Sequence, residues 1–333
     1  MQAYKNMGDK QKILGIELLK FLAAVLITNS HFKALYVEPY TPLGTFGAPG
    51  NALFFFISGY TLMLGRKGDF TVWYKRRIQR IWPSIIAWSA FVAPVFFRQT
   101  LRWQDIWLAG DYWFVHCIVI YYALFYFLIP YLTNLFKHMI VLSVILAALY
   151  FFFIMPMTPF SIYLESFHYI CFFGIMLMGA YLASKRNECK PMKSWKCLSL
   201  AFLMLILFYA LQVIGKGKNN FLYYFQILSL LPLYGFIYYA YMSIRGAWAD
   251  KLVKNTICGT IIRFVAALTL EVYLVGFLLC FCMMGFNELF PFNLIMALAV
   301  IVFVAYIVKI VSNFFIQTFS PEPYNLRKIF VII

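Results

Sequence analysis

The stretch GIELLKFLAAVLITNSHF, residues 15–32, decides the fold class of this chain. It is apolar over most of the roughly 20 residues that a helix needs to cross the hydrocarbon core of a bilayer. It also holds the ionisable residues Glu17, Lys20 and His31. A lysine inside the apolar core is atypical of a signal peptide, and no small-residue cleavage site follows. We therefore expect a retained transmembrane helix that carries polar groups.

The rest of the chain has the same character. Of its 333 residues, 64% are hydrophobic and 12% are charged, whereas a soluble domain is about 45–50% apolar and roughly 25% charged. This composition excludes a soluble enzyme, a disordered chain and a coiled coil. We predict an all-α, polytopic membrane bundle of about ten transmembrane helices, forming a single domain over 1–333. The expected segments are 13–32, 48–64, 79–97, 112–132, 139–155, 165–184, 198–214, 221–243, 264–284 and 291–313.

The net charge of +16 has an explanation that needs no nucleic acid. If the N-terminus is cytoplasmic, 22 lysines and arginines fall in segments on the inner side, among them Lys309, and 5 fall on the outer side. Such a split follows the positive-inside rule. It predicts a multi-pass protein of the bacterial cell membrane with both termini cytoplasmic. The seven cysteines include no CxxC pair, so we expect apolar packing residues and neither disulfides nor a metal site.

Ionisable groups at hydrocarbon depth are functional hypotheses, because each is costly unless it is paired or faces a cavity. Glu17 and Lys20 are three residues apart and can pair on one helix face. Lys20 and His31 are eleven apart, which is about three turns, so they share a face about 16 Å apart along the axis. The alternative is that Lys20 snorkels to the interface and His31 is an interfacial residue. Glu271, inside TLEVYLVG, also needs a partner, for which Lys20 is a candidate.

The stretch YKRRIQRIWP contributes a second kind of candidate. Arg76, Arg77 and Arg80 lie just before or at the start of the third expected helix, on the cytoplasmic side. Arginine binds phosphate in a bidentate manner, so these residues are candidates to bind a phosphorylated donor. They are alternatively anchors to anionic lipid head groups. Ser58 and Gly59 interrupt an aromatic run in the second helix, where small residues usually permit close helix approach.

Together these motifs resemble the membrane acyltransferase family 3, whose members acylate sugars and cell-surface glycans. The resemblance runs in order along the whole chain. Lys20 and His31 match an Arg/Lys-x10-His spacing, FFFISGY at 54–60 matches an FFxxSGF-like segment, and RRIQRIWP at 76–83 matches a basic RRxxRIxP element. YWF at 112–114 and TLEVYLVG at 269–276 are similar to two further family segments. One departure is Gly276, which stands where many relatives have histidine.

The resemblance implies an O-acyltransferase that moves an acyl group, expected to be acetyl, from cytoplasmic acetyl-CoA or another acyl-CoA to a hydroxyl of a cell-surface or lipid-linked sugar. It implies no bound cofactor. His31, Lys20 and Glu271 are then the catalytic candidates. Arg76, Arg77, Arg80 and Ser58 are the donor-binding candidates. The alternatives are a transporter or flippase of a glycan or small molecule, and an inactive scaffold of the same fold.

The charge distribution gives a topology prediction. A reporter that is active only in the cytoplasm should be active when fused to either terminus, because the positively charged loops are retained on the inner side. A periplasmic reporter such as alkaline phosphatase, fused at the same two places, is the control. Phosphatase activity at either terminus would contradict the predicted orientation.

Overall fold

The computed structural model describes residues 14–65, 68–100, 102–107, 109–110, 112–158, 160–188, 192–216, 220–320 and 323–332. Every regular element in these ranges is a helix, and none of the described residues forms a strand. The predicted all-α class is therefore confirmed. The six described cysteines are free thiols, while Cys189 lies outside the described residues.

The chain contacts divide the molecule into two compact units, each assembled from distant parts of the sequence. Unit 1 comprises residues 1–20, 48–66 and 125–256. Its helices are α2 (Gly47–Leu64), α7 (His168–Ser184), α8 (Ser194–Gly215), α9 (Asn220–Tyr223), α10 (Leu230–Ser243) and α11 (Ala247–Asn255), with the first part of α1 (Gly15–His31) and the second part of α6 (Trp113–Phe153).

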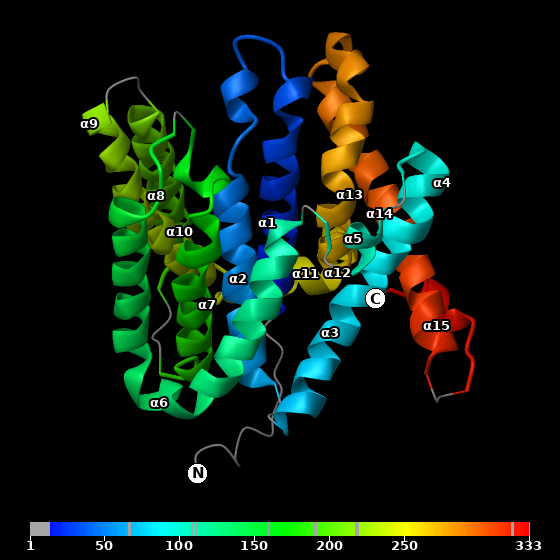
Figure 1. Ribbon diagram of the computed structural model, residues 1–333, viewed down its shortest axis with the longest axis horizontal. Coiled ribbons are helices and arrows are strands. Elements are labelled where there is room, and N and C mark those ends of the chain that lie inside the picture. Colours follow the sequence, from blue (N-terminus) through cyan, green and yellow to red (C-terminus); the bar gives the residue numbers. More distant parts are fainter. Residues whose placement is uncertain are drawn as a thin grey trace. The chain divides into compact units, whose positions relative to one another are not determined.

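Unit 2 comprises residues 21–47, 67–124 and 257–333. It contains the remaining parts of α1 and α6 (Figure 1). Its own helices are α3 (Phe70–Ile86), α4 (Ala93–Phe97), α5 (Trp103–Trp107), α12 (Ile257–Ala267), α13 (Thr269–Cys282), α14 (Phe292–Thr318) and α15 (Arg327–Phe330). A π-helical segment, Ala87–Val92, joins α3 to α4, and 3₁₀ helices at Phe32–Leu35 and Thr41–Leu43 follow α1.

Helix length and hydropathy support a membrane protein, although the expected count of about ten spans is not confirmed. Among the described residues seven helices are long and apolar enough to cross a membrane, or eight if the bent pair α12–α13 is one span. Two of the seven, Trp113–Tyr131 and Leu135–Phe153, correspond to the expected segments 112–132 and 139–155, and both lie on the continuous helix α6. Helices α2 and α7 cover two more expected segments without passing the same test.

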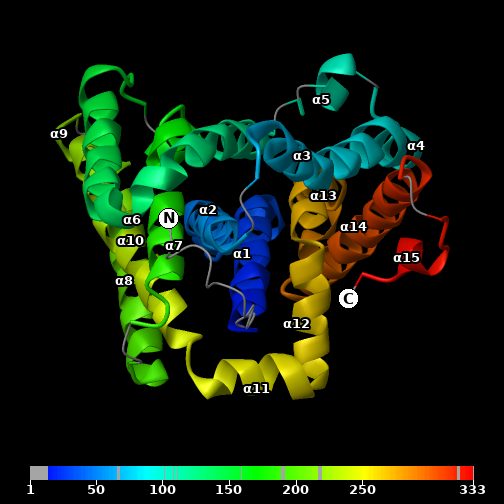
Figure 2. The same ribbon diagram turned by 90° about the horizontal axis from the view of Figure 1, so that it is seen from below.

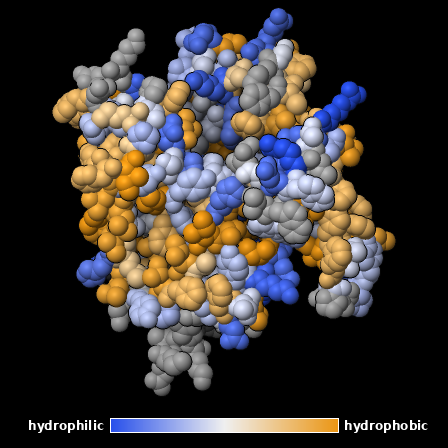
Figure 3. All heavy atoms as spheres, in the orientation of Figure 1, coloured by the Kyte–Doolittle hydropathy of each residue, from blue (hydrophilic) through white to orange (hydrophobic). Residues whose placement is uncertain are grey.

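The outer faces of the long helices are apolar, as contact with lipid requires. Figure 3 shows hydrophobic side chains gathered over the part of unit 1 that carries α6 and α8. The exposed large residues there include Leu146 and Phe153 on α6 and Phe202 and Ile206 on α8. An exposed apolar surface of this kind has no counterpart on an ordinary soluble monomer.

Within unit 1, helices α2 and α7 lie side by side (Figure 2) because glycines replace side chains at their crossing. A Cβ built at Gly59 would overlap the carbonyl oxygen of Met176, and one built at Gly179 would overlap that of Phe56. Small residues are the usual device for close approach of membrane helices. The expectation for Gly59 is therefore confirmed.

Within unit 2, α3, α13 and α14 pack together and position the candidate site. Helix α13 begins after a sharp break, where its axis is bent by 77° from that of α12. Thr269 marks the break, since its hydroxyl donates to the carbonyl of Ala266. Helix α3 contains Pro83, which cannot donate a backbone hydrogen bond, and the π-helical segment follows directly.

Candidate functional site

His31 is the last residue of α1 and lies beside a loop that Asn29 holds in place. The Asn29 amide donates to the carbonyl oxygens of Leu43 (2.7 Å) and Thr45 (3.1 Å). Its oxygen accepts a hydrogen bond from the Tyr36 hydroxyl at 2.7 Å. Burial raises the pKa of the Tyr36 phenol above 10.0, so this donor stays protonated. The end of α1 is therefore fixed by side chain to backbone contacts on both sides of the loop.

The His31 ring is half-buried and borders a pocket of about 440 Å³ in unit 2. One side of the ring meets Phe277 edge-on, with 5.6 Å between the centroids. Neither ring nitrogen has a hydrogen-bond partner within the part of the chain that the structure describes. The pocket is also lined by Ser30, Lys33, Ala34, Thr41 and Cys280. An imidazole with free nitrogens at a pocket is available to accept a proton from a ligand.

Lys20 and Glu17 form the pair that their spacing predicts. The Lys20 ammonium donates to both carboxylate oxygens of Glu17 at 3.2 Å, and the side chains are 27% and 8% exposed. Helix α1 is continuous from Gly15 to His31, so the expected spacing of about 16 Å along the axis between Lys20 and His31 applies.

The three arginines lie inside α3, which begins at Phe70 and so starts nine residues before the expected segment. Arg77 is half-buried and lies over the ring of the buried Trp73, 5.0 Å from its centroid. The Nε of Arg77 is buried and has no hydrogen-bond partner among the described residues. Arg80 is exposed. Arg76 is also exposed, and its Nε donates to the carbonyl of Val72.

Ser58 belongs to unit 1, whereas the arginines belong to unit 2, so each is described within its own unit. The Ser58 side chain is half-buried, and its carbonyl accepts a hydrogen bond from Thr61. The Thr61 hydroxyl also donates to the carbonyl oxygen of Ile57, in the same helix. The contacts of Ser58 that the structure shows are thus within α2, and its assignment to donor binding stays a prediction.

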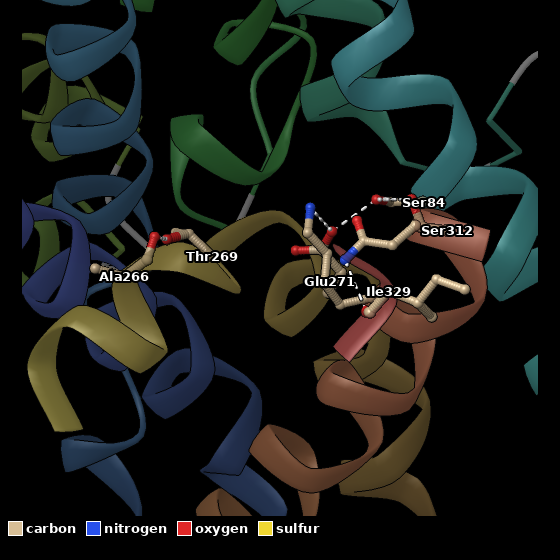
Figure 4. A network of polar contacts seen from close by, with 8 residues as sticks. Ser84, Ala266, Thr269, Glu271, Ser312 and Ile329 are labelled. Carbon is tan, nitrogen blue, oxygen red and sulfur yellow. Dashed lines mark hydrogen bonds and ion pairs between the residues drawn. The ribbon is translucent and has the colours of Figure 1, made fainter. Parts of the chain in front are cut away.

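Glu271 lies at the centre of a buried polar cluster (Figure 4). Its side chain is 1% exposed and its Oε1 accepts hydrogen bonds from Lys309 Nζ (3.0 Å) and Ser84 Oγ (2.6 Å). The hydroxyls of Ser84 and Ser312 are 3.2 Å apart. The cluster joins α3, α13 and α14. Glu271 lies in the first turn of α13, where the helix dipole also stabilises a negative charge.

The partner of Glu271 corrects one sequence-based expectation. Lys20 is the expected partner, but the residue that forms the ion pair is Lys309. Lys309 lies within α14, inside the expected segment 291–313, and its side chain is 24% exposed. Its isolation in an otherwise apolar 27-residue helix was the available signal, because the rule that singles out Glu271 applies equally to a lysine.

Helix geometry connects this cluster to the arginines and to the pocket. Arg77 and Ser84 are seven residues apart on α3, so they share a face about 10 Å apart along the axis. Phe277 follows Glu271 by six residues on α13, which is about 9 Å. Unit 2 therefore contains the arginines, the Glu271 cluster and the His31 pocket, linked by two helices.

The remaining family motifs have structural positions in the same unit. The Tyr112 hydroxyl accepts a hydrogen bond from Trp88 Nε1 (2.6 Å) and donates to the carbonyl of Leu274 (3.0 Å). This contact ties the start of α6 to α13. Gly276 is buried, and a Cβ built there would meet no atom within 4 Å. Crowding therefore does not explain why glycine stands at this position.

The described residues contain no group of three or more His, Cys, Asp or Glu side chains that could hold a metal ion. The absence of a metal from the reaction stays a prediction. The buried ion pair that the structure describes in unit 2 is Glu271–Lys309, and the arginines of α3 lie on the helix that also carries Ser84.

Comparison with known protein families identifies the family to which the chain belongs. The family described as acyltransferase domain, acyltransferase family 3, matches residues 13–313. The chain therefore belongs to this family and is a membrane acyltransferase. No curated protein and no solved structure matches it. The match covers parts of both units and includes every candidate site residue.

The Glu271–Lys309 pair gives a stability prediction. Glu271→Gln or Lys309→Met alone should lower the free energy of unfolding by about 3 kcal/mol, because each change leaves a buried group without its partner. The double variant should regain much of this loss, since neither charge remains. The measurement is the thermal midpoint of the detergent-purified protein. Ser312→Ala, which removes one neutral contact worth about 1 kcal/mol, is the control. An unchanged midpoint in Lys309→Met would show that the pair adds nothing to stability.

Proposed function

We propose that this membrane acyltransferase is an O-acyltransferase of the cell membrane that uses acyl-CoA from the cytoplasm and acylates a hydroxyl of a cell-surface or lipid-linked sugar. The observation that carries the proposal is the half-buried His31, which borders a pocket and whose ring nitrogens have no hydrogen-bond partner among the described residues. The acyl group is expected to be acetyl.

His31 is proposed as the general base. One ring nitrogen takes the proton of the acceptor hydroxyl while the hydroxyl oxygen attacks the thioester carbonyl carbon. The carbon–sulfur bond then breaks, and the proton passes from the imidazolium to the departing CoA sulfur. The products are the O-acyl ester and CoA. An imidazole suits this exchange because its unperturbed pKa lies near neutrality.

The charged groups have supporting roles in this proposal. Arg77, Arg80 and Arg76 bind phosphate groups of CoA from the inner side, with Ser58 as a further donor-binding candidate. Arg77 is the strongest of them, because its partly buried guanidinium has an Nε with no hydrogen-bond partner in the described part of the chain. Glu271 and Lys20 are proposed to supply fixed charge to the catalytic machinery, each held by a counter-charge, Lys309 and Glu17 respectively.

One feature favours the transporter alternative. Discontinuous helices line the binding sites of many secondary transporters, and the bent pair α12–α13 is such a broken helix. The break is, however, occupied by the Glu271 cluster. A broken helix inside an acyltransferase can position a buried carboxylate without moving a solute. Membership of the acyltransferase family therefore decides between the two.

The role of His31 is tested by His31→Gln, which keeps a hydrogen-bonding side chain but cannot take up a proton near pH 7. Acyl transfer should fall by about 10²–10⁴-fold, the usual contribution of a general base. The assay follows radiolabel from acetyl-CoA into the sugar-bearing fraction of membranes, at saturating donor and equal protein abundance. His138→Gln, at an exposed position on α6, should be fully active. Near wild-type transfer by His31→Gln would remove the proposed base.

Donor binding is tested on α3. Arg77→Ala should raise the KM for acyl-CoA by about tenfold or more, the value of one charge-assisted phosphate contact. Arg80→Ala should have a smaller effect, because exposed charges are screened. Arg77→Lys should restore part of the affinity, because lysine keeps the positive charge but cannot form the bidentate hydrogen bonds of a guanidinium group. Lys75→Ala, also exposed on α3, is the control. A folded Arg77→Ala, Arg80→Ala protein with the wild-type KM would identify these arginines as lipid anchors.

A further inference from the structure

A second arginine cluster lies in unit 1, where α7 and α10 end. Arg186 follows α7 and Arg245 follows α10. The Arg245 Nη2 donates to the carbonyl of Arg186 at 2.7 Å. The Arg245 guanidinium also lies 5.8 Å from the centroid of the buried Tyr241 ring. Arg245 is therefore held in place by the chain, which an arginine that only anchors lipid does not need.

A tyrosine of α2 completes this cluster. Tyr60 is 2% exposed, and its ring centroid is 5.5 Å from that of Tyr241. The Tyr60 hydroxyl is buried, and among the described residues no hydrogen bond of acceptable geometry satisfies it. The Tyr241 hydroxyl is within its reach, and Arg186 and Arg245 lie near enough to interact with it electrostatically. A buried hydroxyl in this condition is costly unless a ligand or a water satisfies it.

The cluster carries positive charge without a matching carboxylate. Arg186 and Arg245 are both half-buried, and neither forms an ion pair with any described residue. The acidic residue nearest in sequence, Glu188, pairs instead with Lys185 at 2.7 Å. Each guanidinium group is partly desolvated, and a bound anion offsets the cost of that desolvation.

The scaffold beneath the cluster is rigid. Gly59, next to Tyr60, brings the backbone of α2 against that of α7, and Gly179 does the same from the other side. The backbone of Tyr60 is therefore held in a fixed position relative to α7. Preorganised donors of this kind lose little entropy when they bind a ligand.

We propose that Arg186, Arg245 and Tyr60 form a phosphate-binding site in unit 1, separate from the arginines of α3. Two guanidinium groups and a phenol supply the charge-assisted and neutral donors that phosphate oxygens accept. The phosphate comes from the nucleotide part of CoA or from a phospholipid head group. The site needs no acyl transfer, so binding tests it independently of the proposed function.

The experiment measures CoA and inorganic pyrophosphate binding by calorimetry to the full-length protein in nanodiscs of phosphatidylcholine alone. Arg186→Gln should weaken binding by about tenfold and Tyr60→Phe by about threefold to fivefold. Tyr60→Phe removes only one hydroxyl and so keeps the packing of α2. Lys196→Gln, which also removes an exposed positive charge from unit 1, is the matched control and should change binding less than twofold. The thermal midpoint of each variant confirms folding.

Two further arms separate the phosphate sources. Repeating the titration in an Arg77→Ala, Arg80→Ala background leaves the unit 1 site as the remaining binder, and addition of Arg186→Gln should then abolish binding of pyrophosphate. In nanodiscs that contain phosphatidylglycerol, native mass spectrometry counts the retained anionic lipid. Loss of this lipid in Arg186→Gln and Tyr60→Phe, with CoA binding unchanged, identifies the ligand as a head group. If neither variant alters CoA, pyrophosphate or lipid binding, or if Lys196→Gln has an equal effect, the site does not exist.

Discussion

The buried carboxylate of Glu271 is the constraint on which the arrangement of unit 2 depends. In the hydrocarbon region no water is at hand to solvate a charge, so a carboxylate must find its donors within the protein. Lys309 and Ser84 supply them, and with them α14 and α3 are tied to α13. The break before Thr269 serves the same end, because it puts Glu271 in the first turn of a helix, where the dipole favours a negative charge. In a membrane protein an interrupted backbone is tolerated only where protein or a water-filled cavity surrounds it.

From that fixed point, two helices extend the site in opposite directions. Helix α3 carries the arginine face towards its N-terminus, and α13 continues past Gly276 to Phe277, whose ring contacts His31. A donor with negative charges and an acceptor with a hydroxyl can thus be recognised by different ends of one unit. The Glu271 cluster lies between these two ends of the site. It can influence substrate binding without touching either substrate, because it fixes the positions of α3 and α13 relative to each other. This separates the catalytic role proposed for His31 from the positioning effect of the Glu271 cluster.

The sequence predicts those features that depend on local spacing. Glu17 and Lys20 are three residues apart on one helix, and they pair as expected. Glu271 and Lys309 are 38 residues apart, so no local periodicity could join them, and each could be recognised only as a charge in an apolar segment. The start of α3 was missed because YKRRIQR is basic and lacks a hydrophobic run, although one face of it packs through Trp73. The two segments expected at 112–132 and 139–155 are found as separate candidate spans, Trp113–Tyr131 and Leu135–Phe153, although one helix, α6, runs through both.

The predicted topology assigns most of the lysines and arginines to the inner side of the membrane, but it does not say which of them bind a ligand. The positive-inside rule acts equally on Lys193, Lys196, Arg77 and Arg245. What distinguishes the arginines is partial burial. Lys193 and Lys196 are exposed, whereas Arg77 and Arg245 are half-buried and form no ion pair with a carboxylate among the described residues. A solvated lysine gains its favourable interactions from water and lipid head groups and requires no fixed geometry. A half-buried guanidinium held over an aromatic ring has given up part of that solvation. This loss of solvation is offset when an anion with matching oxygens binds. Burial, and not the number of charges, is therefore the better guide to where the proposed phosphate sites lie.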